Sequence, residues 1–195
     1  ITLDGKKNPG EHKIENTIRN KIRFLDFIRE ILENLFSVIF YTKKNPETLR
    51  SEKVFRHVLG TPTSEDVEVF HEKDDTFGTY VTKSKSNDFI IVGSYSTLST
   101  EAQFLDANNP SGKFTILQAR EKELEYNVAH YKDHFYLLTN KDGATNFKMM
   151  KTPVLATGKE NWVDVIAHRE DTLLEDFSIF KDFIVIEERT NGLNK

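Results

Sequence analysis

A serine nucleophile on an α/β fold is recognised by the pattern G-x-S-x-G, because the sharp turn lifts its hydroxyl out of the sheet toward a base. The nearest string in this chain is Gly93-Ser94-Tyr95-Ser96-Thr97, which lacks the second glycine. It directly follows a strand-like apolar run, so we interpret it as a turn. The sequence therefore predicts no catalytic residue.

Histidine and carboxylate side chains are candidates for a metal site. His71-Glu72 begins the zinc pattern H-E-x-x-H, but the fifth residue is Asp75 and the segment has a strand-and-turn pattern. Other histidines lie at strand ends or in turns, without a second ligand at helical spacing: His57, His130, His134 and His168. We expect these to be partly exposed structural histidines, and we expect no metal.

Two loop patterns are similar to ion or phosphate sites. Asp106 and Asn108 begin like a calcium loop, but Pro110 takes the place of an oxygen ligand and no glutamate closes the loop. We expect a long hairpin turn there. Gly112-Lys113 and Gly158-Lys159 end like a phosphate loop, yet neither is followed by Ser or Thr and neither has glycine five residues earlier. The sequence predicts no cofactor.

The composition limits the classes of protein to which the chain can belong. Its 195 residues include 37% hydrophobic and 11% aromatic side chains, enough for a buried core. Charges of both signs are interspersed with a net charge of −4, which argues against nucleic-acid binding. The absence of cysteine excludes disulfides, and no apolar run approaches the roughly 20 residues of a membrane helix. We expect neither nucleic acid nor membrane as a partner; cytoplasmic and periplasmic locations are both open.

Short strand-like runs, separated by turn-rich segments, cover most of the chain. The 15 phenylalanines, often beside Val, Ile or Tyr, favour such β structure. The predicted strands are Val38–Thr42, Lys53–Leu59, Asp66–Glu72, Phe77–Thr82, Phe89–Ser94, Glu101–Leu105, Lys113–Gln118, Tyr126–His130, His134–Thr139, Asn146–Met150, Trp162–Ile166, Leu174–Ile179 and Phe183–Glu188.

Some of these strands are near copies of one another, and their spacing indicates a repeat. The copies are Val38-Ile39-Phe40-Tyr41, Phe89-Ile90-Ile91-Val92, Phe135-Tyr136-Leu137-Leu138 and Phe183-Ile184-Val185-Ile186. An aspartate turn closely precedes the last three, at Asp88, Asp133 and Asp182. The copies recur every 46 to 51 residues, which fits β-propeller blades of four strands each.

The repeat predicts an all-β fold, a partial β-propeller of about four four-stranded blades. The continuously apolar copies suit positions buried between neighbouring blades. A β-sandwich also places short strands at regular intervals and is the alternative fold. We expect one domain over residues 1–195, with propeller blades in 39–195 and an atypical first blade or helix in 1–38.

One segment departs from the β pattern. In Ile18–Phe36, apolar residues recur every three or four positions with charges between them, which predicts an amphipathic helix. Such a helix could cover an open sheet edge or dock a partner.

From about Ile39 onward, a series of ordered strings carries a family resemblance. The strings are Phe40-Tyr41-Thr42, Thr48-Leu49-Arg50, Val54–Thr61, Val69–Phe77, Gly93-Ser94, Ser96-Thr97-Leu98, Arg120-Glu121, Glu125-Tyr126, Phe135-Tyr136, Thr139-Asn140, Asn161-Trp162, His168-Arg169 and Glu187–Leu193. They resemble the propeller of the oligopeptidase B (protease II) group in the prolyl oligopeptidase family of serine peptidases. Before Ile39 the resemblance weakens, because Ile18–Phe36 stands where relatives have a tryptophan-bearing strand and an aspartate turn.

The resemblance implies a function for the parent protein. Members of this family join a seven-bladed propeller to an α/β-hydrolase domain with a Ser-Asp-His triad, and the oligopeptidase B group cuts short peptides after Arg or Lys. None of the triad segments occurs in this chain, so we expect a propeller fragment that gates substrates by size and is inactive alone. Its expected partners are peptides through the parent enzyme, the missing blades, the hydrolase domain and further copies of itself. The alternative is a free-standing β-propeller interaction module.

Overall fold

The computed structural model describes residues 38–195, together with Lys21 and Arg23. The predicted helix Ile18–Phe36 lies outside the described residues, apart from these two positions. Within residues 38–195 the structure is built from strands and three short 3-10 turns, η1 (Thr63–Glu65), η2 (Lys141–Gly143) and η3 (Lys159–Asn161). The all-β prediction is therefore confirmed for this part of the chain.

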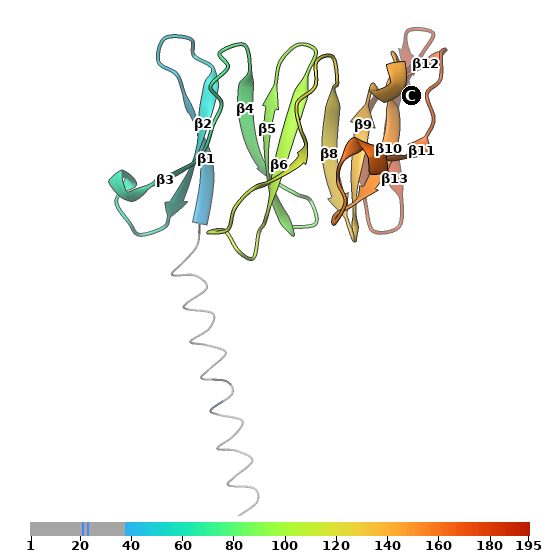
Figure 1. Ribbon diagram of the computed structural model, residues 1–195. Coiled ribbons are helices and arrows are strands. Elements are labelled where there is room, and N and C mark those ends of the chain that lie inside the picture. The colour runs from blue at the N-terminus through green and yellow to red at the C-terminus, as the bar shows by residue number, and fades with distance from the viewer. Residues whose placement is uncertain (1–20, 22, 24–37) are drawn as a thin grey trace, which may run out of the picture. The chain divides into compact units, whose positions relative to one another are not determined.

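The strands form four antiparallel sheets, which we call A to D, as Figure 1 shows. Sheet A contains β1 (Val38–Lys44), β2 (Ser51–Val58) and β3 (Val67–His71). Sheet B contains β4 (Gly78–Lys83), β5 (Phe89–Tyr95), β6 (Thr100–Asp106) and β7 (Thr115–Gln118). Sheet C contains β8 (Tyr126–Tyr131), β9 (His134–Thr139), β10 (Lys148–Pro153) and β11 (Val163–Ile166). Sheet D contains β12 (Thr172–Ile179), β13 (Ile184–Thr190) and β14 (Leu193–Asn194).

Each sheet pairs consecutive strands, as in successive propeller blades. Two details differ from the sequence prediction. The end sheets A and D have three described strands each instead of four. The strand predicted at Asn146–Met150 begins later, because the Asn146 side-chain amide donates to the backbone carbonyls of Arg169 and Glu170 and holds this residue in a loop.

The chain divides into two compact units. One comprises residues 1–39 with 57–66, and the other comprises residues 40–56 with 67–195. In the described part of the first unit, the His57 ring lies 2.6 Å from the Asp66 carboxylate and η1 follows Pro62. The second unit holds most of the four sheets.

Turn length decides which face of a sheet each apolar copy occupies. The tight β8–β9 turn pairs Tyr131 directly with His134, whereas the β4–β5 turn is longer. Side chains alternate along a strand, so this difference moves equivalent residues to opposite faces. Phe89 of sheet B and Phe135 of sheet C consequently face each other, with ring centroids 5.3 Å apart.

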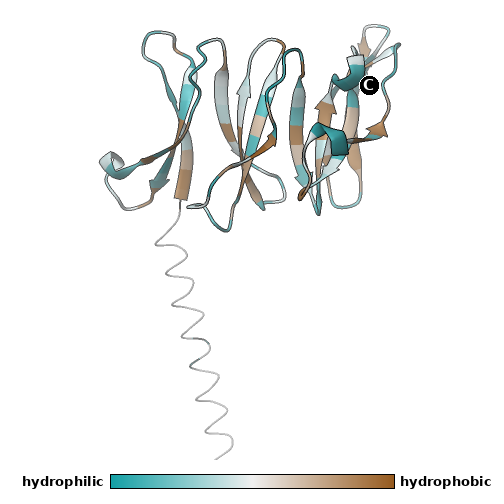
Figure 2. Cartoon of the chain, viewed as in Figure 1, coloured by the Kyte–Doolittle hydropathy of each residue, from teal (hydrophilic) through white to brown (hydrophobic). Residues whose placement is uncertain are grey.

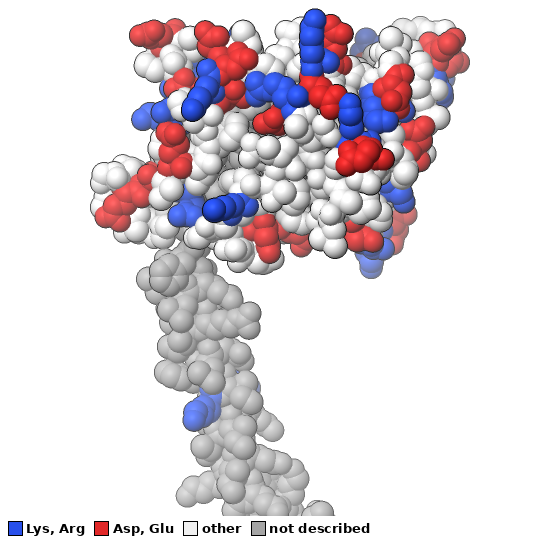
Figure 3. All heavy atoms as spheres, viewed as in Figure 1, with Lys and Arg blue, Asp and Glu red and all other residues white. Residues whose placement is uncertain are grey.

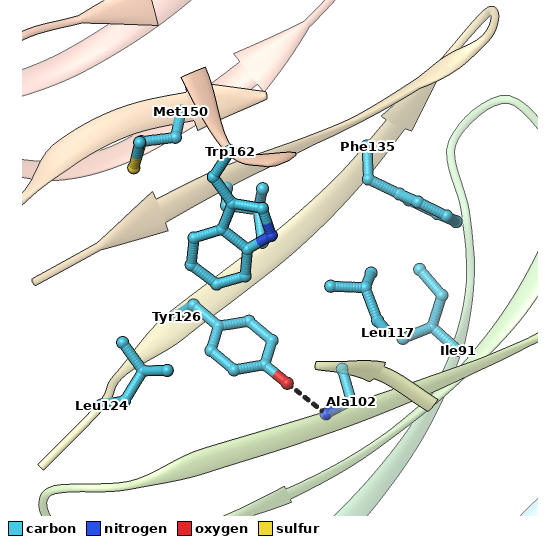
Figure 4. Close-up of a cluster of buried hydrophobic side chains, with 9 residues drawn as sticks. Ile91, Ala102, Leu117, Leu124, Tyr126, Phe135, Met150 and Trp162 are labelled. Atoms are coloured by element: carbon cyan, nitrogen blue, oxygen red, sulfur yellow. Dashed lines mark hydrogen bonds between the residues drawn. The ribbon is translucent and has the colours of Figure 1, made fainter. Parts of the chain in front are cut away.

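A hydrophobic cluster between sheets B and C forms the larger core. Its buried members are Ile91, Ala102, Leu117, Leu124, Tyr126, Phe135, Leu137, Met150 and Trp162. The Tyr126 hydroxyl accepts a hydrogen bond from the Ala102 backbone N–H at 2.8 Å, as Figure 4 shows. The same hydroxyl donates a hydrogen bond to the Gln118 carbonyl at 2.7 Å. Burial raises the pKa of Tyr126, so this hydroxyl stays neutral and couples a strand of sheet C to two strands of sheet B.

Smaller contacts join the other sheets. A second apolar cluster packs sheet C against sheet D and contains Leu138, Met149, Leu174, Phe177 and Ile179. Sheet A meets the loop between β6 and β7 of sheet B through an edge-to-face contact of Phe40 with Phe114 and through a hydrogen bond from Arg56 to the Pro110 carbonyl. Figure 2 shows the pattern behind this packing, since apolar residues are concentrated in the strands and polar residues in the connecting loops.

Among the described residues, no helix has the length and apolar character needed to cross a membrane.

Candidate functional site

The segments that lead from one sheet to the next gather chemically active side chains. These segments, residues 72–77, 119–125 and 167–171, lie at one end of the sheets, which we call the crossover end. The hairpin loops 96–99 and 140–147 lie at the same end, because Tyr95 pairs with Thr100 and Tyr126 pairs with Thr139. Figure 3 shows acidic and basic side chains intermixed over the upper part of the molecule, where these segments lie.

The best-defined charged cluster at the crossover end joins Glu72 to Arg120. The Glu72 side chain is 6% exposed, and one of its oxygens lies 2.5 Å from Arg120 Nη2. Its other oxygen accepts a hydrogen bond from the Asp74 backbone N–H at 3.0 Å. Glu72 follows β3 and Arg120 follows β7, so the ion pair fastens the end of sheet A to the end of sheet B.

Three further groups hold the Arg120 residue in place. Its guanidinium carbon lies 3.6 Å from the centroid of the Phe77 ring, a cation–π contact. Asp74 provides a second carboxylate 3.8 Å from Nη1. The Arg120 backbone N–H donates to the Glu101 carboxylate at 3.0 Å. These contacts fix both the side chain and the backbone at this position.

The electrostatics of the cluster keep its carboxylate ionised. Burial raises the pKa of Glu72, but the neighbouring Ser94 hydroxyl, the Asp74 backbone N–H and Arg120 outweigh burial and hold the pKa below its ordinary value of 4.5. A carboxylate with a lowered pKa is a weaker general base for the neighbouring Ser94 hydroxyl than an ordinary glutamate. The cluster is suited to holding charge and position, not to activating a nucleophile.

Ser94 lies in strand β5, whereas the sequence analysis interpreted its segment as a turn. The prediction of a turn at Gly93–Thr97 was wrong for its first residues, because β5 extends through Tyr95. The turn begins at Ser96, whose backbone N–H donates to the Ser99 carbonyl. Ser94 is 1% exposed inside the sheet, where a hydroxyl has no room to meet a substrate carbonyl.

A polar cleft of about 690 Å³ lies next to Arg120 at the crossover end. Its floor includes the buried side chains of Leu124 and Trp162, and its walls come from loops 121–124, 140–145 and 159–160. Acidic and basic groups alternate around it, and Lys159 bridges the walls through an ion pair with Glu121. The cleft offers charged contacts for another polypeptide surface.

His130 has the most unusual surroundings of the histidines. The sequence predicted a partly exposed residue, and this was wrong, since His130 is 4% exposed beneath Phe89 and Phe135. Its Nδ1 lies 2.8 Å from the Ser86 hydroxyl and 3.5 Å from Asp88. Serine and aspartate thus share one ring nitrogen, whereas a catalytic triad places them on opposite nitrogens.

The other histidines make local contacts. His57 pairs with Asp66, His134 lies 2.8 Å from the adjacent Asp133, and His168 Nε2 accepts from the Asn146 backbone N–H at 3.3 Å. No group of three or more metal-ligating side chains occurs among residues 38–195, 21 and 23.

The two loop patterns that are similar to ion or phosphate sites make ordinary turn and sheet contacts. Asp106 accepts a hydrogen bond from the Asn108 backbone N–H at 2.8 Å, and the Gly112 N–H donates to the Asn109 carbonyl. This confirms the predicted long turn between β6 and β7. The Lys159 backbone N–H donates to the Gln118 side chain, so the Gly158-Lys159 pair serves a contact between sheets C and B.

Sequence reasoning did not foresee the Glu72–Arg120 pair. The two residues are 48 positions apart, and neither belongs to a spacing pattern with a known chemistry. One signal was present: His71-Glu72, Ser94 and Arg120-Glu121 all occur in strings that carried the family resemblance. The fold brings these three strings together at the junction of sheets A and B.

Comparisons with known proteins place this architecture in context. Residues 36–195 match the family model "Prolyl oligopeptidase, N-terminal beta-propeller domain". A dipeptidyl aminopeptidase BI from Pseudoxanthomonas mexicana is 43% identical over 155 residues, covering 80% of this chain and 21% of the relative. Protease 2 from Moraxella lacunata is 34% identical over 157 residues, covering 80% of this chain and 22% of the relative.

A solved structure shows the same fold. Oligopeptidase B from Leishmania major has a TM-score of 0.76 and 32% sequence identity, covering 80% of this chain and 22% of the other. The chain therefore spans 21–22% of the length of these relatives.

Proposed function

Because this chain belongs to the prolyl oligopeptidase family through its N-terminal β-propeller domain, we propose that it is the substrate-gating part of a serine oligopeptidase. The parent enzyme hydrolyses short peptides after Arg or Lys. Its nucleophile and base belong to a hydrolase domain, and residues 39–195 supply blades of one propeller domain that orients peptides and excludes large ones. The family match over residues 36–195 is the observation that carries this proposal.

The site geometry supports a gating role over a catalytic one. The buried Ser94 has a carboxylate of lowered pKa beside it, and Lys159 and Glu121 at the crossover end form an ion pair. Relatives named protease 2 and oligopeptidase B support peptide hydrolysis by the parent. The proposed partners are peptide substrates, the remaining blades, the hydrolase domain and, for the isolated chain, a second copy.

A domain exchange tests the proposal. Residues 39–195 would replace the matching segment of the Moraxella lacunata protease 2, and the chimera would be assayed on arginyl, lysyl and alanyl peptides and on a folded protein. We expect cleavage of short arginyl and lysyl peptides only, with a chimera lacking the nucleophilic serine as the inactive control. A folded chimera that degrades the protein substrate as fast as the peptides would contradict a gating role.

A further inference from the structure

Another pocket lies at the end of sheets B and C that is opposite the crossover end. It is formed by the β4–β5 turn, the β8–β9 turn and residues 153–155 at the end of β10, and we call it the turn pocket. Its volume of about 400 Å³ falls within the range of roughly 300–1,000 Å³ that is typical of ligand sites. A pocket of this size suits a short piece of a polypeptide.

The walls of the turn pocket are largely apolar, and the fold fixes them in place. Phe89 and Val154 line the pocket and also pack against the core between sheets B and C. The Val154 backbone N–H donates to the Asp133 carbonyl at 3.0 Å, which ties the end of β10 to the β8–β9 turn. Leu155 also lines the pocket and is 98% exposed. An apolar side chain that enters the pocket would leave water against these residues.

Two aspartates give the turn pocket a negative rim. Asp88 and Asp133 line it, and their side chains are 56% and 83% exposed. A hydrogen bond from His134 lowers the pKa of Asp133, so this carboxylate is ionised at neutral pH. Among the described residues, neither aspartate forms an ion pair with a lysine or an arginine. The Lys132 ammonium, also at the pocket, lies 5.1 Å from the centroid of the Tyr131 ring. The rim therefore favours a cation.

His130 adds a hydrogen-bonding group to the turn pocket. Its ring is buried, and its Nε2 atom has no hydrogen-bond partner in the part of the chain that the structure describes. The Asp88 carboxylate, 3.5 Å from Nδ1, favours a proton on Nδ1, which leaves Nε2 as an acceptor. A buried acceptor without a partner costs free energy. A ligand that brings an N–H donor to this nitrogen would remove that cost.

We propose that the turn pocket binds the N-terminal residue of a peptide, with an apolar side chain against Phe89, Val154 and Leu155 and the ammonium group at the acidic rim. In such a residue the apolar side chain and the charge are attached to the same carbon, which matches apolar walls and an acidic rim within one pocket. A free amino acid fits less well, because Asp88 and Asp133 would repel its carboxylate. The inference goes beyond the proposed gating function and does not depend on it.

Peptide titration of the isotope-labelled 195-residue chain, followed by NMR, tests the class of ligand. The probes are Leu-Gly-Gly amide, Gly-Gly-Gly amide, N-acetyl-Leu-Gly-Gly amide and free leucine. We expect Leu-Gly-Gly amide to shift the backbone signals of the three segments around the pocket. It should bind more than about tenfold more tightly than Gly-Gly-Gly amide, which has no side chain to bury.

The other two probes test the charge. Acetylation removes the ammonium group and should weaken binding more than about threefold, and free leucine should bind more weakly because it adds a carboxylate. Each of three results would overturn the proposal: no shift with Leu-Gly-Gly amide, equal binding of any other probe, or shifts spread over the crossover end.

Matched substitutions test the position of the site. Leu155 and Leu98 are exposed, at 98% and 54%, so alanine at either position should leave the fold intact. Leu155→Ala should raise the dissociation constant of Leu-Gly-Gly amide by about threefold, because it removes apolar contact area. Leu98→Ala, in the hairpin loop 96–99 at the crossover end, should leave this constant unchanged. Equal effects of the two substitutions would contradict the assigned position.

A charge substitution separates the rim from the walls. Asp133→Asn should weaken the binding of Leu-Gly-Gly amide and leave that of the acetylated peptide unchanged, because only the first peptide carries an ammonium group. An equal effect on both peptides would rule out recognition of the N-terminus. Peptide cleavage by the chimera does not depend on these results, so the two proposals can fail separately.

Discussion

Arg120 joins several parts of the structure at the crossover end. It pairs with the buried Glu72, covers the Phe77 ring and anchors its backbone to Glu101. Replacing Arg120 by Met would leave the Glu72 carboxylate buried without its partner. We expect Arg120→Met to lower the free energy of unfolding by about 3 kcal/mol, measured by urea denaturation.

A surface pair supplies the control for this experiment. Lys122 lies two residues further on and is 91% exposed, 3.7 Å from Glu123. Lys122→Met should change the free energy of unfolding by less than about 0.5 kcal/mol. The double variant Glu72→Gln with Arg120→Met should recover part of the loss, because it removes the orphaned charge. Equal effects of Arg120→Met and Lys122→Met would refute a structural role for the cluster.

His130 gives the fold a dependence on pH. Burial lowers its pKa below the ordinary value of 6.5, against the opposing effect of Asp88 and Asp133. As pH falls, the unfolded chain therefore takes up this proton first. The stability that neutral His130 contributes is complete above about pH 6.5 and is lost as pH falls toward the folded-state pKa.

The pH dependence can be measured directly. We expect the melting temperature to fall between about pH 7.5 and about pH 5.5. His130→Phe keeps an aromatic ring against Phe89 and Phe135 but cannot be protonated, so its melting temperature should fall less over this range. Identical slopes for the two proteins would exclude His130 as the source.

At the scale of elements, Tyr126 couples two sheets. Its hydroxyl is the shared partner of the Ala102 N–H in β6 and the Gln118 carbonyl in β7. Tyr126→Phe removes this partner while keeping the ring in the core. We expect a loss of about 1–3 kcal/mol in the free energy of unfolding, because two buried backbone groups lose a hydrogen bond. A change below about 0.5 kcal/mol would show that the packing of sheets B and C does not depend on this hydroxyl.

The sequence predicted the positions of the strands well, but it predicted poorly which side chains on them are buried. Runs such as Phe89–Ser94 and His134–Thr139 correspond closely to β5 and β9, because apolar β-branched and aromatic residues between turn signals specify strands locally. The equivalent Phe89, Phe135 and Phe183 nevertheless have different surroundings. The first two meet across sheets B and C and the third is 60% exposed, since turn length and position in the series decide burial.

The candidate site was less predictable than the strands. Motif reasoning examines residues at short fixed spacings, whereas Glu72 and Arg120 meet only when sheet A packs beside sheet B. The burial of His130 likewise depends on aromatic rings from two sheets, Phe89 and Phe135. Contacts between sheets require the tertiary fold, so local patterns did not predict them.

At the scale of the whole molecule, the regular sequence repeat and the family match both indicate propeller blades. The period of 46 to 51 residues predicted blades, and the four sheets follow that order along the chain. The matching relatives are about five times longer than the matched segment, since it covers 21–22% of their lengths.

The most direct test of this account is peptide hydrolysis by the purified 195-residue chain on short arginyl and lysyl substrates. The account predicts no turnover above the buffer rate, because Ser94 is buried and its neighbouring carboxylate is a weak base. Turnover that co-purifies with the chain and disappears in Ser94→Ala would contradict the gating role and place the catalyst within these sheets.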